Sequence, residues 1–380
     1  MRVLLVTHYY STHRGGIESV AGQLASLLGR EHDIVWAASD CDPSPDSLPA
    51  RVRFLRMRTS NVVERLTGLP LPIWGPLSAV QLVRSIRGAD VVHLHDFSYL
   101  GNVLAWLFAK LRRKPVVITQ HIGLVPIRNR MFRVLLQLIH LTLGPILLRA
   151  ANRVVFISRV VRDHYLGRVS FAVPPLVIEN GVDTSLFAPG EKNQRELARV
   201  TLGLDPTRPV VLFVGRFVEK KGLNILRDLV SRVRDVTWVF AGWGPLDPNS
   251  WGEPHVLVMK DRSGRTLVPL YHAADLMVLP SVGEGLPLVI QEALSCGTPV
   301  LTGTDTAAAV NAPSDAVYSC DVRPDAVEKW EAEIRRLVDT RHVRLARRLA
   351  IAEFARTRWS WDVCAAAYSD LFASLKTNHG

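Results

Sequence analysis

Two glutamates and two basic residues in the second half of the chain have the types and spacing to bind a phosphorylated, hydroxyl-rich ligand. Glu284 and Glu292 stand eight residues apart in LPSVGEGLPLVIQEALSCGTPV, the first in a glycine-flanked loop and the second within an expected helix. Arg216 and Lys221 belong to PVVLFVGRFVEKKGL, just after an expected strand. Carboxylates accept hydrogen bonds from hydroxyls, while guanidinium and ammonium groups neutralise a diphosphate without a metal. Either glutamate alone is equally compatible with a surface position at a helix start, and either cation with a solvated turn.

Glycine-containing turns follow several expected strands. Gly15 and Gly16 open a helix after the first strand, Gly215 ends a strand in the second half, and Gly242 begins the turn in AGWGPL. Backbone N–H groups at such turns and helix starts can approach a phosphate closely. The sequence contains neither G-x-G-x-x-G nor the P-loop pattern, which argues against a dinucleotide-dependent oxidoreductase and a P-loop NTPase.

Short β-branched strands alternate with helical segments along the whole chain, which predicts parallel sheets wound by right-handed crossovers. Ligands bind at the carboxyl ends of the strands in open α/β sheets, so the residues above fall at the edge where a ligand is expected. We expect five strands in each half. They are Val3–Thr7, Ile34–Ala37, Val91–Leu94, Val116–Thr119, Val154–Ile157, Val210–Val214, Thr237–Ala241, Val256–Met259, Leu276–Leu279 and Pro299–Leu301.

A long break between these two sets of strands divides the chain. Residues 170–207 carry turn and linker signals, among them Pro174-Pro175 and Asn180-Gly181. We therefore predict two doubly wound, Rossmann-like α/β domains, residues 1–180 and 181–358, that face each other across a cleft. Residues 359–380 are predicted to form a final helix.

The charge of the chain is unevenly distributed. Its 46 Lys and Arg exceed 35 Asp and Glu, and the surplus lies in residues 1–180, which hold 22 basic and 11 acidic residues. This imbalance indicates a membrane surface, a nucleic acid or a phosphorylated substrate as partner, or simply an arginine-rich sequence of the kind found in GC-rich bacteria. An apolar share of 48% excludes an intrinsically disordered chain.

Cysteine usage and hydropathy indicate the compartment. Cys41, Cys296, Cys320 and Cys364 lie far apart without a C-x-x-C pattern, so neither a disulfide framework nor a zinc site is expected, and a cytoplasmic location is favoured. Asp40-Cys41-Asp42, in a proline-rich loop, is a poor metal site. The longest apolar run, Val134–Leu148, is interrupted by polar residues and falls short of the about 20 residues that a spanning helix needs.

Together, the motifs resemble the group-four (GT4) family of retaining glycosyltransferases, which have the GT-B fold and use nucleotide sugars. The matching segments follow the family's order and cover nearly the whole chain. They are the Gly15-Gly16 loop, TQHIG, VIENGVD, GRFVEKKGL, AGWGPL, LYHAADLMVLPS, the segment from Glu284 to Glu292, and the terminal WSWDVCAAAYSDLFASL. This last segment resembles the family's final helix, which crosses back to the N-terminal domain.

The resemblance implies a role for each matching residue. Arg216 and Lys221 would bind the donor diphosphate and stabilise the charge on the departing nucleotide. Glu292 would accept hydrogen bonds from the ribose hydroxyls, and Glu284 would contact the donor sugar near the reacting carbon. His121, in TQHIG, would sit beside the sugar; without the family motifs it is an ordinary loop histidine after a strand.

Further contacts are implied for main-chain positions, and no metal or other cofactor is expected. Gly15 and Gly16 would lie near the diphosphate or the acceptor. The remaining donor-binding positions are Gly215, Gly242, Gly285 and Leu286. Pro287 departs from the family's usual glycine and lacks an N–H, so one backbone contact to the sugar is absent. The segments VLVMKDRSG and TGTDTAAAVNA also depart from the family pattern, which leaves the base preference open.

The basic first half suggests where the acceptor binds. Residues 128–168 hold eight arginines and one aspartate around the apolar run Val134–Leu148. A basic, apolar helical segment is typical of attachment to an anionic membrane surface, here the inner face, and of a lipid-linked glycan acceptor for polysaccharide biosynthesis. The alternative is that Val134–Leu148 is a buried helix of the first domain.

Three classes of function stay open. The favoured one is a retaining nucleotide-sugar glycosyltransferase, with a lipid-linked, cell-surface or soluble small-molecule acceptor. The second is a related GT-B enzyme, such as a nucleotide-sugar epimerase or hydrolase. The third, a basic nucleic-acid binder, is disfavoured because the sequence has no aromatic stacking strip, zinc spacing or recognisable reader module.

Overall fold

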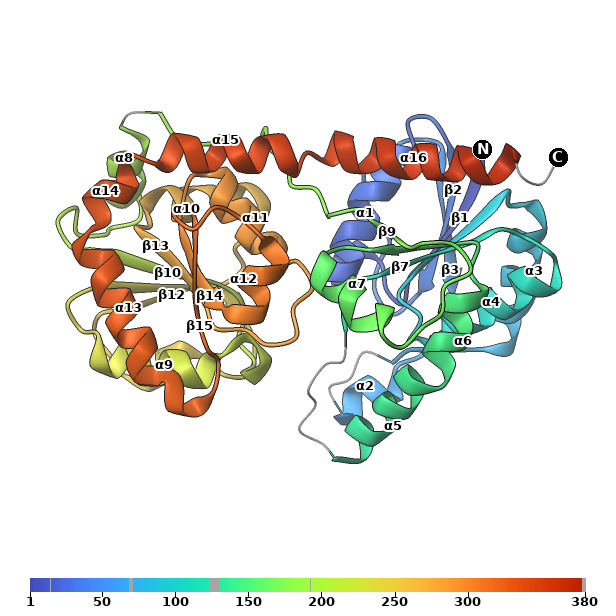
Figure 1. The fold of residues 1–380 in the computed structure, drawn as a ribbon, viewed down its shortest axis with the longest axis horizontal. Coiled ribbons are helices and arrows are strands. Elements are labelled where there is room, and N and C mark those ends of the chain that lie inside the picture. Colours follow the sequence, from blue (N-terminus) through green and yellow to red (C-terminus); the bar gives the residue numbers. More distant parts are fainter. Residues whose placement is uncertain (14, 68–70, 124–129, 192, 378–380) are drawn as a thin grey trace. The chain divides into compact units, whose positions relative to one another are not determined.

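The computed structural model describes residues 1–13, 15–67, 71–123, 130–191 and 193–377 (Figure 1). The chain divides into two compact units. Unit 1 comprises Met1–Gly181 together with Trp361–Gly380, and unit 2 comprises Val182–Ser360. The predicted ranges were 1–180, 181–358 and 359–380.

Unit 1 contains a seven-stranded parallel sheet in the order β3-β2-β1-β6-β7-β8-β9. The central strands are apolar, β-branched and buried on both faces, as parallel strands covered by crossover helices must be. The strands are β1 (Arg2–Val6), β2 (Asp33–Ser39), β3 (Val52–Met57), β6 (Val91–His95), β7 (Val116–Gln120), β8 (Arg153–Phe156) and β9 (Leu176–Val177). A separate antiparallel pair is formed by β4 (Thr59–Ser60) and β5 (Ile73–Trp74).

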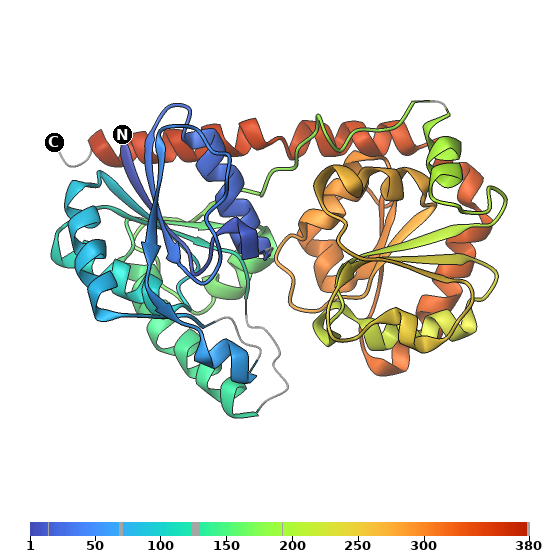
Figure 2. The same ribbon diagram turned by 180° about the vertical axis from the view of Figure 1, so that it is seen from behind.

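The helices of unit 1 pack in groups around this sheet. Helices α3 and α4 contact each other, and so do α1 and α16, which lie side by side in both views (Figures 1 and 2). The helices are η1 (Ser11–His13), α1 (Gly16–Leu28), α2 (Val62–Thr67), α3 (Pro76–Gly88), α4 (Leu100–Leu111), α5 (Arg130–Leu141), α6 (Leu143–Ala150), α7 (Arg159–Leu166) and α16 (Trp361–Thr377).

Helix α16 is tied to unit 1 by buried polar contacts. The Tyr368 hydroxyl shares a hydrogen bond with the Thr119 hydroxyl at 2.9 Å. Ser369 lies 2.8 Å from Nε2 of His32. The last helix therefore completes the fold of unit 1, although it follows unit 2 in the sequence.

Unit 2 contains a six-stranded parallel sheet in the order β12-β11-β10-β13-β14-β15. Its strands are β10 (Val210–Arg216), β11 (Thr237–Trp243), β12 (Val256–Met259), β13 (Leu276–Leu279), β14 (Val300–Gly303) and β15 (Val317–Cys320). Its helices are α8 (Gln194–Thr201), η2 (Glu219–Lys221), α9 (Leu223–Arg232), η3 (Pro248–Trp251), η4 (Gly264–Thr266), α10 (Val268–Ala273), α11 (Leu288–Ser295), α12 (Thr304–Val310), η5 (Pro324–Ala326), α13 (Val327–Asp339), α14 (Arg341–Leu345) and α15 (Arg348–Arg358).

The two parallel α/β sheets confirm the predicted fold class, but the prediction of five strands in each half is wrong. The main sheets contain seven and six strands because β3, β9 and β15 were missed. All three are edge strands, which are covered incompletely and so lack a continuous apolar run. Strand β9 and helix α8 also lie inside the segment 170–207 that the sequence presented only as a break.

The apolar run Val134–Leu148 forms parts of two helices and is neither wholly buried nor wholly exposed. Helix α5 ends at Leu141 and α6 begins at Leu143. Leu147 and Leu148 are buried in the core, whereas Val134, Leu138, Leu141 and Ile146 are 46 to 60% exposed. Arg128 lies outside the described residues, and so do the side chains of Arg130 and Arg133. In the part of the chain that the structure describes, no helix is long and apolar enough to cross a membrane.

Candidate active site

In unit 2, the structure brings Lys221 and Glu284 together at the carboxyl edge of the sheet. Nζ of Lys221 lies 2.9 Å from Oε1 of Glu284, and Nζ of Lys220 lies 3.9 Å from the same oxygen. Both cations come from η2, which follows β10, and Glu284 lies in the loop between β13 and α11. Two of the residues predicted to be catalytic, which are His121, Glu284, Arg216 and Lys221, are therefore direct partners.

Close packing of the main chain produces this ion pair. Gly222, between η2 and α9, has φ +80°, and a Cβ there would lie 2.2 Å from the carbonyl oxygen of Pro280. Only glycine permits both that conformation and that approach. The Val282 N–H also donates to the Lys220 carbonyl at 3.0 Å. These contacts fix η2 against the loop that carries Glu284.

Electrostatics keep Glu284 ionised. Burial raises the pKa of its carboxyl, but the attraction of Lys221 and Lys220 outweighs burial, so the pKa lies below its ordinary value. Burial lowers the pKa of the Lys220 ammonium, with Arg216 and Lys221 as further positive neighbours. Two lysines thus share one carboxylate, and Arg216 adds a third positive charge near Lys220, an arrangement that favours an additional anion.

Arg216 ends β10 and points its guanidinium over an aromatic ring. Its Cζ lies 5.1 Å from the ring centroid of Trp243, its register partner on β11. Among the described residues, Arg216 forms no ion pair.

Gly215 and Gly242 are register partners on β10 and β11, one position before Arg216 and Trp243. A Cβ on Gly242 would meet the Gly215 carbonyl at 1.9 Å. Strand packing alone therefore accounts for glycine at position 242, without a bound ligand.

Glu292 lies in α11, as predicted, but pairs with a tyrosine and with none of the cations. The hydroxyl of Tyr271, on α10, donates to Oε2 of Glu292 at 2.8 Å. Burial raises the pKa of Glu292 to about 7, although this hydrogen bond opposes the shift. Gly285 and Leu286, also predicted to bind the donor, are buried between Glu284 and α11.

In unit 1, His121 follows β7 and lies in a cluster of buried histidines. Its Nε2 is 2.9 Å from Nδ1 of His95, at the end of β6. Burial lowers the pKa of His121 to about 4, while the charges of Asp96 and Glu18 oppose the shift. His8, just beyond β1, places Nε2 2.8 Å from Oε1 of Glu18, and both side chains are at most 4% exposed.

The Gly15-Gly16 loop adjoins the same cluster through Glu18. A Cβ on Gly15 would lie 2.1 Å from Oε2 of Glu18, whereas a Cβ on Gly16 would meet nothing within 4 Å. The space beside Gly15 is therefore occupied by the Glu18 carboxylate, whereas the space beside Gly16 is open. Glu18 also places negative charge in the first turn of α1, where the helix dipole is positive.

Three residues of this edge were not predicted: His8, Glu18 and His95. His8 and His95 each stand at the carboxyl end of a strand, the position that marked the other candidates, so the sequence carried that signal. The position of Glu18 three residues after Gly15 is the local spacing at which a glutamate reaches back to a helix start, but its pairing with His8 depends on distance in space.

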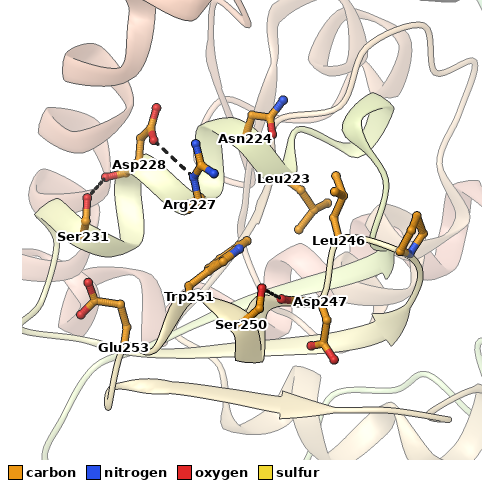
Figure 3. Close-up of a pocket in the computed structure, with 11 residues that line it drawn as sticks. Leu223, Asn224, Arg227, Asp228, Ser231, Leu246, Asp247, Ser250, Trp251 and Glu253 are labelled. Carbon is orange, nitrogen blue, oxygen red and sulfur yellow. Dashed lines mark hydrogen bonds and ion pairs between the residues drawn. The ribbon is translucent and has the colours of Figure 1, made fainter.

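A groove of about 510 Å³ lies elsewhere on unit 2, between α9 and η3 (Figure 3). Trp251 and Leu223 lie inside it, and Arg227 and Asp228 project from α9. None of the predicted donor-binding residues lines it. Its charged lining consists of the carboxylates of Asp228, Asp247 and Glu253 and the guanidinium of Arg227. This excess of negative charge does not suit a diphosphate, so the groove is distinct from the candidate site.

No group of three or more histidine, cysteine or carboxylate side chains is arranged to hold a metal ion in the ranges that the structure describes. Asp42, from the loop considered above, instead places Oδ2 2.7 Å from Nδ1 of His13.

Comparison with solved structures identifies the class of fold. Over its whole length the chain superposes on a sucrose-phosphate synthase from Thermosynechococcus elongatus, with a TM-score of 0.77, 18% identity and complete coverage of both chains. It also superposes on the Anabaena protein HepE, determined in complex with UDP and glucose, with a TM-score of 0.76 and 17% identity. That comparison covers 98% of this chain and 100% of HepE. The fold is that of the GT-B glycosyltransferases.

Comparison of sequences identifies the family. Residues 14–186 match the family model described as glycosyltransferase family 4, and residues 208–340 match the one described as glycosyl transferases group 1. The chain belongs to glycosyltransferase family 4, and it is a glycosyltransferase.

Named relatives are similar over part of their length. The D-inositol 3-phosphate glycosyltransferase of Corynebacterium aurimucosum is 29% identical over an alignment of 321 positions that covers 75% of this chain and 71% of the relative. The enzyme of the same name from Mycolicibacterium smegmatis is 32% identical over an alignment of 221 positions that covers 53% of this chain. That alignment spans about half, 49%, of the relative's length.

Proposed function

We propose that this protein transfers a hexose from a nucleoside diphosphate sugar to an acceptor hydroxyl, with retention of the anomeric configuration and without a metal ion. The observation that carries this proposal is the pair of lysines, Lys220 and Lys221, at the Glu284 carboxylate, with Arg216 as a further positive neighbour of Lys220. A diphosphate supplies the anion that this group favours, and Glu284 beside it supplies an acceptor for sugar hydroxyls.

The chemistry requires stabilisation of a leaving group more than covalent catalysis. As the bond to the diphosphate breaks, negative charge grows on the nucleotide and the sugar becomes oxocarbenium-like. Lys221 and Arg216 would stabilise the departing diphosphate, the kind of preorganised electrostatic contribution that dominates many enzymes. Glu284 would orient the sugar through its hydroxyls, and Glu292 would accept hydrogen bonds from the ribose. We assign attack by the acceptor to the face from which the nucleotide leaves.

The relatives support the donor class and leave the acceptor open. HepE, whose fold this chain shares, was determined with UDP and glucose, and two relatives are named D-inositol 3-phosphate glycosyltransferases. We infer a nucleotide sugar as donor, with UDP-sugars as the first to test.

Thermal unfolding with a panel of UDP-, GDP- and TDP-sugars, in the presence of a chelator, tests the donor site. We expect one nucleotide sugar to raise the melting temperature of the wild type, and Arg216→Ala and Glu292→Ala to abolish the shift. Arg227→Ala is the matched control, because Arg227 is an exposed arginine of unit 2 outside the candidate site. If no nucleotide sugar or nucleoside diphosphate shifts the transition, the proposal of a donor site is wrong. Retention is tested by the anomeric configuration of the product.

We further propose that the acceptor is lipid-linked and that unit 1 binds an anionic membrane surface. Helices α5 and α6 expose the four apolar side chains described above. Near the end of α6, a pocket of about 470 Å³ is lined by the cations Lys110, Arg149 and Arg153 and by no carboxylate among the described residues. Exposed apolar groups beside uncompensated cations suit the interface of an anionic bilayer.

Flotation with phosphatidylglycerol vesicles tests this part of the proposal. We expect the wild type to co-float at low salt and to be released at high salt, because the attraction is screened. Leu138→Glu should reduce binding, whereas Leu197→Glu should not. Leu197 is the matched control, since it is 58% exposed on α8 of unit 2 and Leu138 is 53% exposed. Absence of co-flotation at low salt would rule out membrane binding and favour a soluble acceptor.

A further inference from the structure

Three histidines lie together at the carboxyl end of two neighbouring strands of unit 1. His93 and His95 belong to β6, and His121 directly follows β7. The rings of His95 and His121 are nearly parallel, at 25°, with centroids 5.1 Å apart, and Nδ1 of His95 lies 2.9 Å from Nε2 of His121. His93 makes a different hydrogen bond, from Nε2 to the Thr119 hydroxyl at 2.8 Å. His95 is thus the histidine that contacts His121 through a ring nitrogen.

Both members of this pair are neutral at physiological pH. Burial lowers the pKa of His95 well below its ordinary value, and the neighbouring histidines lower it further. Burial likewise lowers the pKa of His121 to about 4. A neutral imidazole carries one N–H and one nitrogen lone pair. The short contact between the rings therefore contains a single proton, which belongs either to Nδ1 of His95 or to Nε2 of His121.

The surroundings of His95 decide between these two arrangements. Its other ring nitrogen, Nε2, is buried and has no hydrogen-bond partner among the residues that the structure describes. If His121 donated the proton, His95 would carry its own hydrogen on Nε2, where it would be an orphaned N–H. In protein interiors orphaned backbone N–H groups are rarer than under-satisfied carbonyl oxygens, and we extend this preference to the ring nitrogens of His95. The proton therefore belongs on Nδ1 of His95.

The main chain holds His95 firmly in this position. The side-chain amide of Asn102 donates to the carbonyl oxygens of His95 and Asp96, at 2.7 and 2.6 Å. Asp96 has φ +71°, an unfavourable conformation for a residue other than glycine. The side-chain amide of Gln120, next to His121, donates to the Asp96 carboxylate at 3.1 Å. Such maintained strain clusters at functional sites.

We propose that His95 is a positioning residue that fixes the tautomer of His121. Its Nδ1–H donates to Nε2 of His121, so His121 carries its own hydrogen on Nδ1. His121 then meets a sugar as a hydrogen-bond donor through Nδ1 and does not act as a base through Nε2. The inference deepens the proposed function and rests on it for the role of His121 toward a sugar; the tautomer itself follows from unit 1 alone.

Two-bond proton–nitrogen correlation spectra of the full chain labelled with ¹⁵N-histidine read the tautomer directly. His121→Gln assigns the signals. In the wild type we expect His121 to show a protonated Nδ1 and an unprotonated Nε2 throughout pH 6 to 8. In His95→Gln the fixed tautomer should be lost, because an amide can either donate or accept. His93→Gln, at the histidine two residues earlier on the same strand, should leave the His121 signals unchanged. A wild-type His121 protonated on Nε2 would overturn the inference.

Kinetics test the consequence for the reaction, with the nucleotide sugar found in the thermal unfolding panel. We expect His95→Gln to lower kcat about 10-fold, within the range for partners that orient a functional group, with little change in the KM for the donor. His93→Gln should stay within about twofold of the wild type. Equal losses in the two variants would mean that burial matters and the contact with His121 does not, which would overturn the positioning role.

The two readouts separate this inference from the proposed function. If the spectra show the expected tautomer but no nucleotide sugar is bound or consumed, the proposed function fails and the assignment of the tautomer holds. If transfer is observed but His121 carries its proton on Nε2, the proposed function holds and the role of His95 is refuted.

Discussion

The carboxyl edges of the two sheets share an architecture and differ in their chemistry. In unit 2 the edge carries lysines and an arginine that remain in contact with solvent, with side chains of Lys220 and Lys221 32 and 19% exposed. In unit 1 the edge carries histidines that are almost completely buried, together with one buried pair between His8 and Glu18. The edge of unit 2 therefore carries several solvent-accessible cationic side chains, whereas most of the ionisable side chains at the edge of unit 1 are buried histidines.

Burial explains this difference. Removing a charge from water is costly, so His93, His95 and His121 have lowered pKa values and stay neutral. At the edge of unit 2, Lys220 and Lys221 reach water and face the Glu284 carboxylate, and Arg216 is exposed. The same kind of sheet edge can therefore suit either a diphosphate or neutral hydroxyl groups, depending on how deeply its polar side chains are buried.

The largest expected effect comes from removing a cation of unit 2. Lys221→Ala should lower kcat/KM by about 10² to 10³, because Lys221 is the closest cation to Glu284 and is proposed to stabilise the leaving diphosphate. Steady-state transfer assays measure this loss. Lys220→Ala is the matched control and should cost much less, since its Nζ lies 3.9 Å from the same oxygen. Equal losses would show that the edge supplies only bulk positive charge.

In unit 1 the corresponding test concerns the buried pair of His8 and Glu18. Glu18→Gln should lower the free energy of unfolding by about 2 kcal/mol near pH 7, the range for a hydrogen bond to a charged group. Burial raises the pKa of Glu18, but His8 outweighs burial and the pKa lies below its ordinary 4.5. The stability that Glu18 contributes is therefore present above pH 4.5 and lost as the pH falls through the lowered pKa.

Denaturant unfolding from pH 3 to 7 checks this dependence. The difference between wild type and Glu18→Gln should shrink toward the acid end. Glu31→Gln, at an exposed glutamate of the same unit, should match the wild type throughout. A difference that is independent of pH would mean that Glu18 acts through packing.

Glu292 should show the opposite dependence on pH. Its pKa is raised to about 7, so the folded protein binds a proton more readily than the unfolded chain, and stability should fall as the pH rises from 4.5 to about 7. Glu292→Gln should remove this slope and, at pH 8, raise the free energy of unfolding by about 1–3 kcal/mol. Unfolding curves at pH 5 and 8 measure both effects. A slope that persists in the variant would assign it to other groups.

The smallest effect should distinguish the two glycines at the start of α1. Gly16→Ala should change the free energy of unfolding by less than about 0.5 kcal/mol, because its Cβ would meet open space. Gly15→Ala should be the more destabilising, because its Cβ would displace the buried carboxylate of Glu18. Thermal unfolding of the two variants makes the comparison. Equal stability would show that Glu18 moves aside at no cost.

Much of the fold could be predicted from the sequence. Every expected strand occurs in the structure, because these strands are largely apolar runs that local composition reveals, the edge strand β12 included. Glu284 in a loop, Glu292 in a helix and Lys221 after β10 were also placed correctly by local patterns, whereas Arg216, expected after the strand, is its last residue. The edge strands β3, β9 and β15 were missed because half-covered strands do not need such runs.

The sequence by itself determined which residues stand at strand ends and which of them are ionisable. Only the tertiary structure decided their partners and protonation. That Lys221 meets Glu284 depends on the approach of Gly222 to Pro280, 58 residues later in the chain. That Glu292 has a pKa near 7 and His121 near 4 depends on burial. Spacing along a chain sets local conformation, whereas desolvation and pairing depend on distances in space, which the fold alone supplies.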